Sequence, residues 1–211
     1  MISDEPWAAP VTDRRIAHHG HVWDVVTESI DYNGETLVRD LIDHPGAVAV
    51  VALNEADEVM LIQQYRHPIR HRDWEIPAGL LDVDGEPPLL AAQRELAEEV
   101  DLVAADWAVL ADMATSPGGS NEMIRIFLAR GLSGAPSVHD RGAEEADIVA
   151  RWVPLDEAAE AVLRRQVQNG PTMVGILAAH AARARGWETL AAADSPWPRH
   201  PAVRDERTAG R

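Results

Sequence analysis

One short stretch constrains this chain more than any other, because its pattern predicts a helix with a single apolar side. Pro87 and Pro88 suit the first turn of a helix, where a missing N–H is harmless. From Leu89 to Val100 the apolar residues recur at helical spacing and give the segment one apolar face. The stretch therefore predicts an amphipathic helix over 89–100.

The polar side of this helix carries carboxylates near its C-terminal end. Glu95 and Glu99 lie one turn apart on the same face, with Glu98 beside them. Like charges at this spacing cost roughly 0.2–0.5 kcal/mol each, and the helix dipole disfavours anions here by about 0.3–1 kcal/mol each. Arg94 can pair with Glu98, which relieves only part of the repulsion. A solvated acidic face is one explanation; a site for a hard divalent cation, Mg²⁺ or Mn²⁺, is the other.

Patterns elsewhere in the chain predict a mixed α/β fold. Asn33-Gly34 stands between two alternating runs, 22–32 and 35–44, and is the strongest short hairpin signal. Strands before, around and after helices indicate a mixed sheet with helices on both sides. Further strands are predicted at 47–53, 59–65, 107–114, 123–129 and 148–155, and further helices at 156–165 and 169–187.

The charge of the chain limits its partners. Its net charge is −16, so its surface repels the phosphates of nucleic acids and anionic lipid, and we expect neither nucleic acid nor membrane as a partner. All nineteen basic residues are arginine, which excludes lysine catalysis, and the lack of cysteine excludes disulfides and thiol catalysis. The longest apolar run, Ala47 to Leu53, is too short to span a bilayer. Cytoplasm is the default compartment.

The stretch from Gly79 to Leu102 resembles the signature of the Nudix hydrolases, G-x5-E-x7-R-E-U-x-E-E-x-G-U, in which U is aliphatic. The sequence departs from it twice: six residues separate Gly79 from Glu86, and Asp101 stands where the signature has its last glycine. The matching positions are Gly79, Glu86, Arg94, Glu95, Leu96, Glu98, Glu99 and Leu102.

This resemblance implies a Nudix α/β/α sandwich with a mixed sheet, preceded by a small antiparallel N-terminal β segment. A loop–helix–loop would hold Mg²⁺, for which Mn²⁺ can substitute. The implied metal ligands and the residues that orient and neutralise them are Glu95, Glu99, the carbonyl of Ala78 and Glu86, together with Arg94 and Glu98. The signature itself says nothing about the substrate.

Three other features resemble the ADP-ribose pyrophosphatase branch of the family. They are the N-terminal hairpin, the segments Gln64–His67 and Trp74–Leu80, and the loop Ser116–Glu122. The resemblance implies Mg-dependent hydrolysis of ADP-ribose to AMP and ribose 5-phosphate by a homodimer. It also divides the chain into an N-terminal segment over 1–44 that builds the dimer and a catalytic domain over 45–186. The tail, 187–211, is rich in proline and charge and is predicted to be disordered.

Several residues outside the signature are candidates to bind such a substrate. The arginine fork suits phosphate oxygens, a tryptophan can stack on adenine, and paired glycines let the backbone approach a sugar or phosphate. Each also has a plainer explanation: a surface ion pair, a core tryptophan or a simple turn. The candidates are Arg66, Arg70, Trp74, Gly118, Gly119 and Glu122.

The general base is expected in the acidic loop 140–147, as the resemblance implies. That loop supplies Glu144 and Glu145, and Glu145 is the preferred candidate, although a solvated carboxylate is the alternative. Two other functions stay open. One is hydrolysis of a different nucleoside diphosphate derivative, such as a nucleotide sugar or a dinucleoside polyphosphate. The other is a domain that binds ADP-ribose without cleaving it.

Overall fold

The computed structural model describes residues 2–137 and 147–200. Its helices are α1 (Pro88–Val100), α2 (Leu155–Leu163) and α3 (Gly170–Arg183). Its strands are β1 (Val11–His18), β2 (Asp24–Tyr32), β3 (Glu35–Asp43), β4 (Ala47–Ala52), β5 (Glu58–Arg66), β6 (His71–Glu75), β7 (Ala78–Leu80), β8 (Leu102–Ala114), β9 (Met123–Gly134), β10 (Val149–Pro154) and β11 (Ala191–Ala192). None of these helices is long and apolar enough to cross a bilayer.

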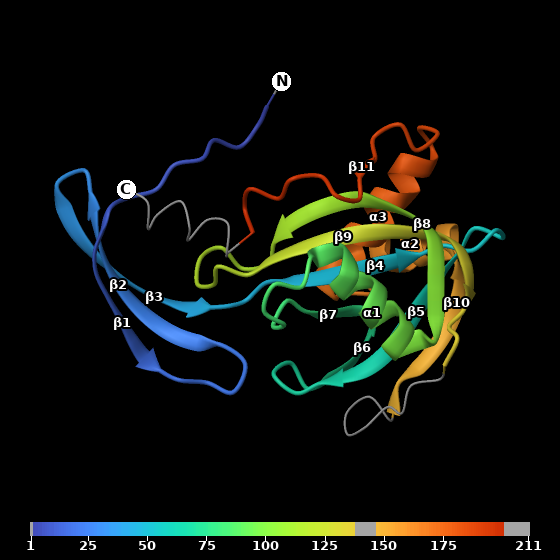
Figure 1. Cartoon of the computed structure of the whole chain (residues 1–211), viewed down its shortest axis with the longest axis horizontal. Helices are drawn as coiled ribbons and strands as arrows, with labels where there is room; N and C mark the ends of the chain where they lie inside the picture. The colour runs from blue at the N-terminus through green and yellow to red at the C-terminus, as the bar shows by residue number, and fades with distance from the viewer. Residues whose placement is uncertain (1, 138–146, 201–211) are drawn as a thin grey trace.

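The N-terminal strands form a separate antiparallel sheet in the order β1-β2-β3, which stands beside the main body (Figure 1). Asn33 and Gly34 both have positive φ, 57° and 84°, as the hairpin turn between twisted strands requires. The predicted hairpin is therefore confirmed. Strand β1 was not predicted, because all eight of its residues are exposed and give no alternating pattern.

The main sheet has the order β11-β8-β9-β4-β7, with β4 parallel to β9 and antiparallel to β7, so it is mixed as predicted. Side chains of β4 alternate between its two faces. Val48 and Val50 belong to the core cluster that includes α1, whereas Ala49 and Val51 belong to the cluster that includes α2 and α3. Helices thus cover both faces, and the expected α/β/α architecture is confirmed (Figure 1).

A smaller sheet, β10-β5-β6, completes the body. Strand β6 leads directly through Ile76 and Pro77 into β7, and the N–H of Ile76 donates to the hydroxyl of the buried Thr172 in α3 at 3.0 Å. The short strand β7 is therefore fixed at the edge of the main sheet, where it faces α1. Pro77 and Gly79 gave this segment no sequence pattern typical of a regular strand.

The segment after α3 differs from its prediction in the part that the structure describes. Residues 187–200 were expected to be disordered, yet β11 pairs with β8 and Trp197 is only 7% exposed. Arg125 explains this order, because its guanidinium lies 4.8 Å from the centre of the Trp197 ring and donates to the carbonyl of Ser195 at 2.7 Å. One aromatic anchor and one buried arginine outweigh a composition typical of disorder.

Candidate active site

The backbone of β7 meets the C-terminal half of α1. The N–H of Val50 donates to the carbonyl of Pro77 at 2.8 Å, so the next residue, Ala78, turns its own N–H and carbonyl away from β4. The N–H of Ala78 donates to Oε2 of Glu99 at 2.9 Å. Glu99 is only 5% exposed, so this hydrogen bond fixes a buried carboxylate at the free edge of the sheet.

Glu95 lies one turn earlier on α1 and presses against the backbone of Gly79. A Cβ placed on Gly79 would stand 2.0 Å from Cδ of Glu95 and 2.1 Å from its Oε1. The carboxylate therefore fills the space that a side chain would need. Only glycine at this position lets Glu95 reach the edge of the sheet beside Glu99.

Arg94 gathers three further carboxyl contacts. Its Nε and Nη2 donate to the two oxygens of Glu86 at 3.1 and 3.0 Å, and its Nη1 donates to Glu95 at 2.5 Å and to Glu98 at 3.2 Å. The hydrogen bonds with Glu86 raise the pKa of Arg94 and lower the pKa of Glu86. The guanidinium thus offsets part of the repulsion between the carboxylates around it. We call this group the Arg94 cluster; it consists of Glu86, Arg94, Glu95 and Glu98.

The segment that builds this site lies within a region of the chain that matches a known family. The family model of the NUDIX domain matches residues 43–173, which is more than half of the chain's 211 residues. The chain belongs to the Nudix family. It is 42% identical over 197 residues to an ADP-ribose pyrophosphatase of Mycobacterium tuberculosis, a similarity that covers 92% of this chain and 93% of that protein.

Other proteins are also similar over most of the chain. An ADP-ribose pyrophosphatase of Bacillus subtilis is 34% identical over 158 residues, which are 74% of this chain and 84% of that protein. The structure of an ADP compounds hydrolase matches with a TM-score of 0.71 at 19% identity, covering 87% of this chain and 99% of that one. The latter likeness supports the fold.

The donors of this Nudix helix fit a hard divalent cation. Glu95, Glu99 and the carbonyl of Ala78 offer oxygen only, without sulfur or imidazole. The space beside Gly79 holds the Glu95 carboxylate and leaves no room for a side chain on residue 79. Within the described ranges, no three acidic or histidine side chains converge as a finished metal cage. Glu95 is instead held by Arg94. The proposed ligand set therefore stays a prediction.

Two predicted phosphate-binding arginines lie in the β5–β6 hairpin. Arg66 donates through Nε and Nη2 to Glu75 at 2.8 and 2.6 Å, and Glu75 is only 2% exposed. This fork is thus already engaged by a buried carboxylate. Arg70 is exposed and has a positive φ of 55° in the turn. Trp74 packs on the core cluster that includes α2 and α3, as expected for a core tryptophan.

The predicted residues of the β8–β9 loop lie where the N-terminal sheet joins the body. The carbonyl of Gly119 accepts the N–H of Ile42 at 2.9 Å, and a Cβ on Gly118 or Gly119 would meet nothing within 4 Å. Glu122 accepts from the hydroxyl of Thr115 at 2.6 Å. Gly119 therefore takes part in the junction between the N-terminal sheet and the body. The proposed bases, Glu144 and Glu145, lie outside the described residues.

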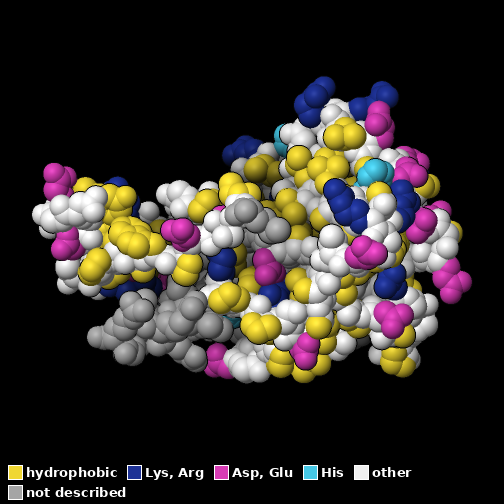
Figure 2. Space-filling model, turned by 90° about the horizontal axis from the view of Figure 1, so that it is seen from above, with side chains coloured by type: hydrophobic (Ala, Val, Ile, Leu, Met, Phe, Trp, Pro, Cys, Tyr) yellow, Lys and Arg dark blue, Asp and Glu magenta, His cyan; other side chains and the backbone are white. Residues whose placement is uncertain are grey.

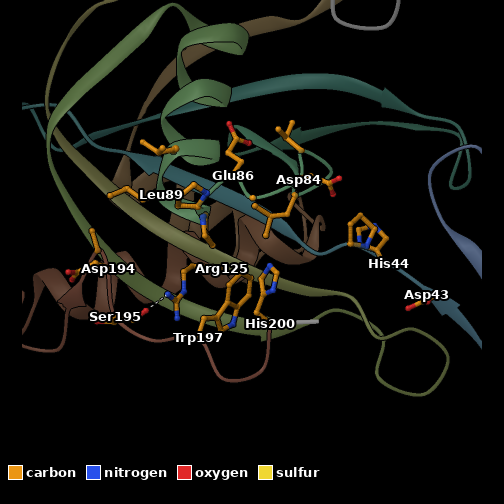
Figure 3. A pocket seen from close by; sticks show the side chains of 18 residues that line it. Asp43, His44, Asp84, Glu86, Leu89, Arg125, Asp194, Ser195, Trp197 and His200 are labelled. Carbon is orange, nitrogen blue, oxygen red and sulfur yellow. Dashed lines mark hydrogen bonds between the residues drawn. The ribbon is translucent and has the colours of Figure 1, made fainter. Parts of the chain in front are cut away.

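An open pocket of about 820 Å³ adjoins the Nudix loop, and sequence reasoning did not find it. Figure 3 shows Glu86 and Leu89 on one side, Arg125 and Trp197 on the other, and His44 toward the N-terminal sheet. Of the Arg94 cluster, only Glu86 lines this pocket. The sequence contained little indication of this pocket, because its walls come from four segments that are far apart in the chain.

Proposed function

We propose that this Nudix protein is a pyrophosphohydrolase that hydrolyses ADP-ribose to AMP and ribose 5-phosphate with Mg²⁺. The observation that carries the proposal is the position of Glu95 and Glu99, which the backbone of Gly79 and Ala78 holds at one edge of the sheet. The substrate follows from similarity: the relative from Mycobacterium tuberculosis, named ADP-ribose pyrophosphatase, matches over 92% of this chain.

The residues of the site divide the work in this proposal. Glu95, Glu99 and the carbonyl of Ala78 would hold the metal, with Glu86 as a further ligand. When bound, Mg²⁺ supplies charge neutralisation for the phosphates and lowers the pKa of a water molecule. Arg94 keeps the carboxylates close together until then, because its guanidinium donates to Glu86, Glu95 and Glu98.

Other residues complete the proposal. Glu145 would take the proton from the attacking water, as a general base must. Arg66 and Arg70 would bind phosphate oxygens; the pairing of Arg66 with Glu75 fixes the orientation of its guanidinium, which favours a defined position over a mobile one. Residues Trp74, Gly118, Gly119 and Glu122 stay candidates for the walls of the substrate site.

We further propose a homodimer built through the N-terminal sheet and a cytoplasmic location. Large apolar side chains are exposed on that sheet, and Figure 2 shows them gathered over the part of the molecule that projects from the body. Exposed patches of this kind mark interaction surfaces. The exposed apolar residues are Val11, Ile16, Tyr32 and Val38. The ring of Trp7 contacts that of Tyr32 edge to face.

A substrate panel tests the function. The purified chain would be given ADP-ribose, GDP-mannose and a dinucleoside polyphosphate, each with Mg²⁺ and with excess chelator, and products would be separated chromatographically. GDP-mannose belongs in the panel because an Enterobacter relative named GDP-mannose pyrophosphatase is 28% identical over 152 residues. We expect AMP and ribose 5-phosphate, only with metal, and the highest kcat/KM for ADP-ribose. If another compound gave a higher kcat/KM, that compound and not ADP-ribose would be the preferred substrate. If ADP-ribose bound but gave no products, the protein would be a sensor of ADP-ribose.

A further inference from the structure

The chain passes from the smaller sheet to the main sheet through Ile76 and Pro77, which join β6 to β7. On the α1 side of this link, the N–H of Ala78 donates to Glu99 at 2.9 Å. On the α3 side, the N–H of Ile76 donates to the hydroxyl of Thr172 at 3.0 Å. Helices on opposite faces of the main sheet therefore hold the same short stretch of backbone, one on each side of Pro77.

Thr172 is polar at a position of α3 where the helix faces the core. It has no exposed surface, and the other buried residues of the helix are Gly175, Ile176, Ala179 and Ala182. A buried hydroxyl is unfavourable unless it is hydrogen-bonded. The hydrogen bonds of Thr172, and not its packing, therefore distinguish it from an aliphatic residue of the same shape.

The hydroxyl of Thr172 is fixed in direction by Asn169. It donates to Oδ1 of Asn169 at 2.8 Å, and the same oxygen accepts the N–H of Thr172 at 3.1 Å as the cap of α3. The hydroxyl proton is thereby committed to Asn169, which leaves the lone pairs of the oxygen for the N–H of Ile76. Thr172 thus presents an oriented acceptor to the link between β6 and β7.

Close packing brings α3 within reach of this link. A Cβ on Gly175 would stand 3.0 Å from Cδ1 of Ile76 and 3.0 Å from Cγ2 of Val51, so a side chain there would crowd the contact between α3 and the sheet. Gly175 lies about one turn beyond Thr172 on the same side of the helix. The reach of the Thr172 hydroxyl therefore depends on a helix–sheet distance that the core itself sets.

We propose that Thr172 is a positioning residue for the reaction: through the N–H of Ile76 it sets where the backbone of Ala78 and the carboxylate of Glu99 stand. The inference rests on the proposed function, in which the carbonyl of Ala78 and Glu99 hold the metal. Without the hydroxyl, the N–H of Ile76 would have no acceptor in the core, and the link would shift to satisfy it. Groups that orient metal ligands influence metal affinity although they do not touch the metal.

The first test is Mn²⁺ binding by the full chain without substrate, measured by calorimetry. Thr172→Val keeps the shape of the side chain and removes the acceptor. We expect it to weaken Mn²⁺ binding about tenfold or more, as the loss of a group that supports a metal ligand does. Thr172→Ser keeps the hydroxyl, so its affinity should stay within about threefold of the parent's.

A matched control separates positioning from general stability. Val162 of α2 is 4% exposed and belongs to the same core cluster as Ile76. Val162→Ala removes buried methyl groups and should lower the melting temperature, yet it should leave Mn²⁺ affinity within about twofold of the parent's. Weakening by Val162→Ala that equals the weakening by Thr172→Val would overturn the inference.

Amide hydrogen exchange, followed by NMR on the metal-free chain, tests the contact without metal or turnover. The N–H groups of Ile76 and Ala78 should exchange about tenfold faster in Thr172→Val than in the parent, measured relative to the N–H of Phe127 in the centre of the main sheet. Thr172→Ser should exchange like the parent. Acceleration that is equal at Phe127 and at Ala78 would show a loss of global stability alone, and would overturn the inference.

The remaining outcomes are equally decisive. Parent-like Mn²⁺ affinity in Thr172→Val, or a parent that binds no Mn²⁺, overturns the inference. If Thr172→Val does not fold, Thr172→Ala removes the same hydroxyl without adding volume and gives the same comparison. Failure of the proposed function looks different: the parent would not cleave ADP-ribose, whereas Mn²⁺ affinity and the exchange of Ala78 would still depend on Thr172.

Discussion

Gly79 and Glu95 approach each other so closely that a Cβ on the glycine would lie 2.0 Å from the glutamate carboxyl carbon. Real Cβ atoms essentially never come within 3.0 Å of another heavy atom. Gly79 does not have a positive φ, so its lack of a side chain, and not its backbone freedom, is what the site uses. The Nudix glycine therefore sets how near Glu95 can come to β7.

The first prediction replaces this glycine. Gly79→Ala should push the Glu95 carboxylate away from β7 and lower kcat about 100-fold, the scale that a displacement of roughly 1 Å can cost. Overpacking should also cost about 1–3 kcal/mol of the free energy of unfolding. Gly134→Ala is the control, because a Cβ there meets nothing within 4 Å. Turnover assays and denaturant melts measure both effects; unchanged kcat in Gly79→Ala would contradict the role of the cradle.

The second prediction concerns Asp101, which replaces the last glycine of the Nudix signature. It adopts the left-handed conformation, with φ 55° and ψ 36°, and its N–H still donates to the carbonyl of Ala97 at 3.1 Å. Asp tolerates this region at a cost of about 1 kcal/mol. Asp101→Gly should raise the free energy of unfolding by roughly 1 kcal/mol and change kcat less than about three-fold. Activity that appears only in the variant would mean the parent is inactive.

The third prediction concerns pH and His44, which is 7% exposed. Its Nδ1 accepts the N–H of Gly46 at 3.0 Å, so the ring is neutral with its proton on Nε2, which lies 3.5 Å from Glu122. Burial lowers the pKa of His44, and Glu122 opposes this in part. The unfolded chain therefore binds more protons as pH falls through about 6.5 and below, and stability decreases there.

The measurement is the free energy of unfolding at pH 7.5 and at pH 5.5. His44→Asn keeps an acceptor for the N–H of Gly46 and removes the titration, so its stability should fall less between these pH values than the parent's. His21→Asn, at an exposed position, should behave like the parent. A loss of stability that is equally large in His44→Asn would assign the pH dependence to other groups.

Local spacing accounts for what the sequence predicted well. The pair Arg94–Glu98 is four residues apart on one helix, and the structure places them 3.2 Å apart. The hairpin at Asn33-Gly34 and the helix end at Asp101 also depend on neighbouring residues alone. Each of these features follows from backbone geometry over a few residues, which a sequence shows directly.

Contacts between distant segments explain what the sequence did not show. Trp197 looked like part of a disordered tail, because its anchor Arg125 is on β9 and is itself fixed by Asp112 on β8. Likewise, Arg66 is paired with the buried Glu75 on the facing strand, a contact that the arginine pattern could not show. Periodicity carries no information about such pairings, since they depend on strand order.

The most direct test of the central claim is the turnover of ADP-ribose by the Glu99→Gln variant. Glutamine keeps the size of the side chain and an acceptor for the N–H of Ala78, but it removes the charge that would bind Mg²⁺. Glu55→Gln, at an exposed turn, serves as the control. We predict that kcat in saturating Mg²⁺ falls by about 100-fold or more in Glu99→Gln, with an unchanged melting profile. Near-parental kcat in a folded Glu99→Gln would contradict the account.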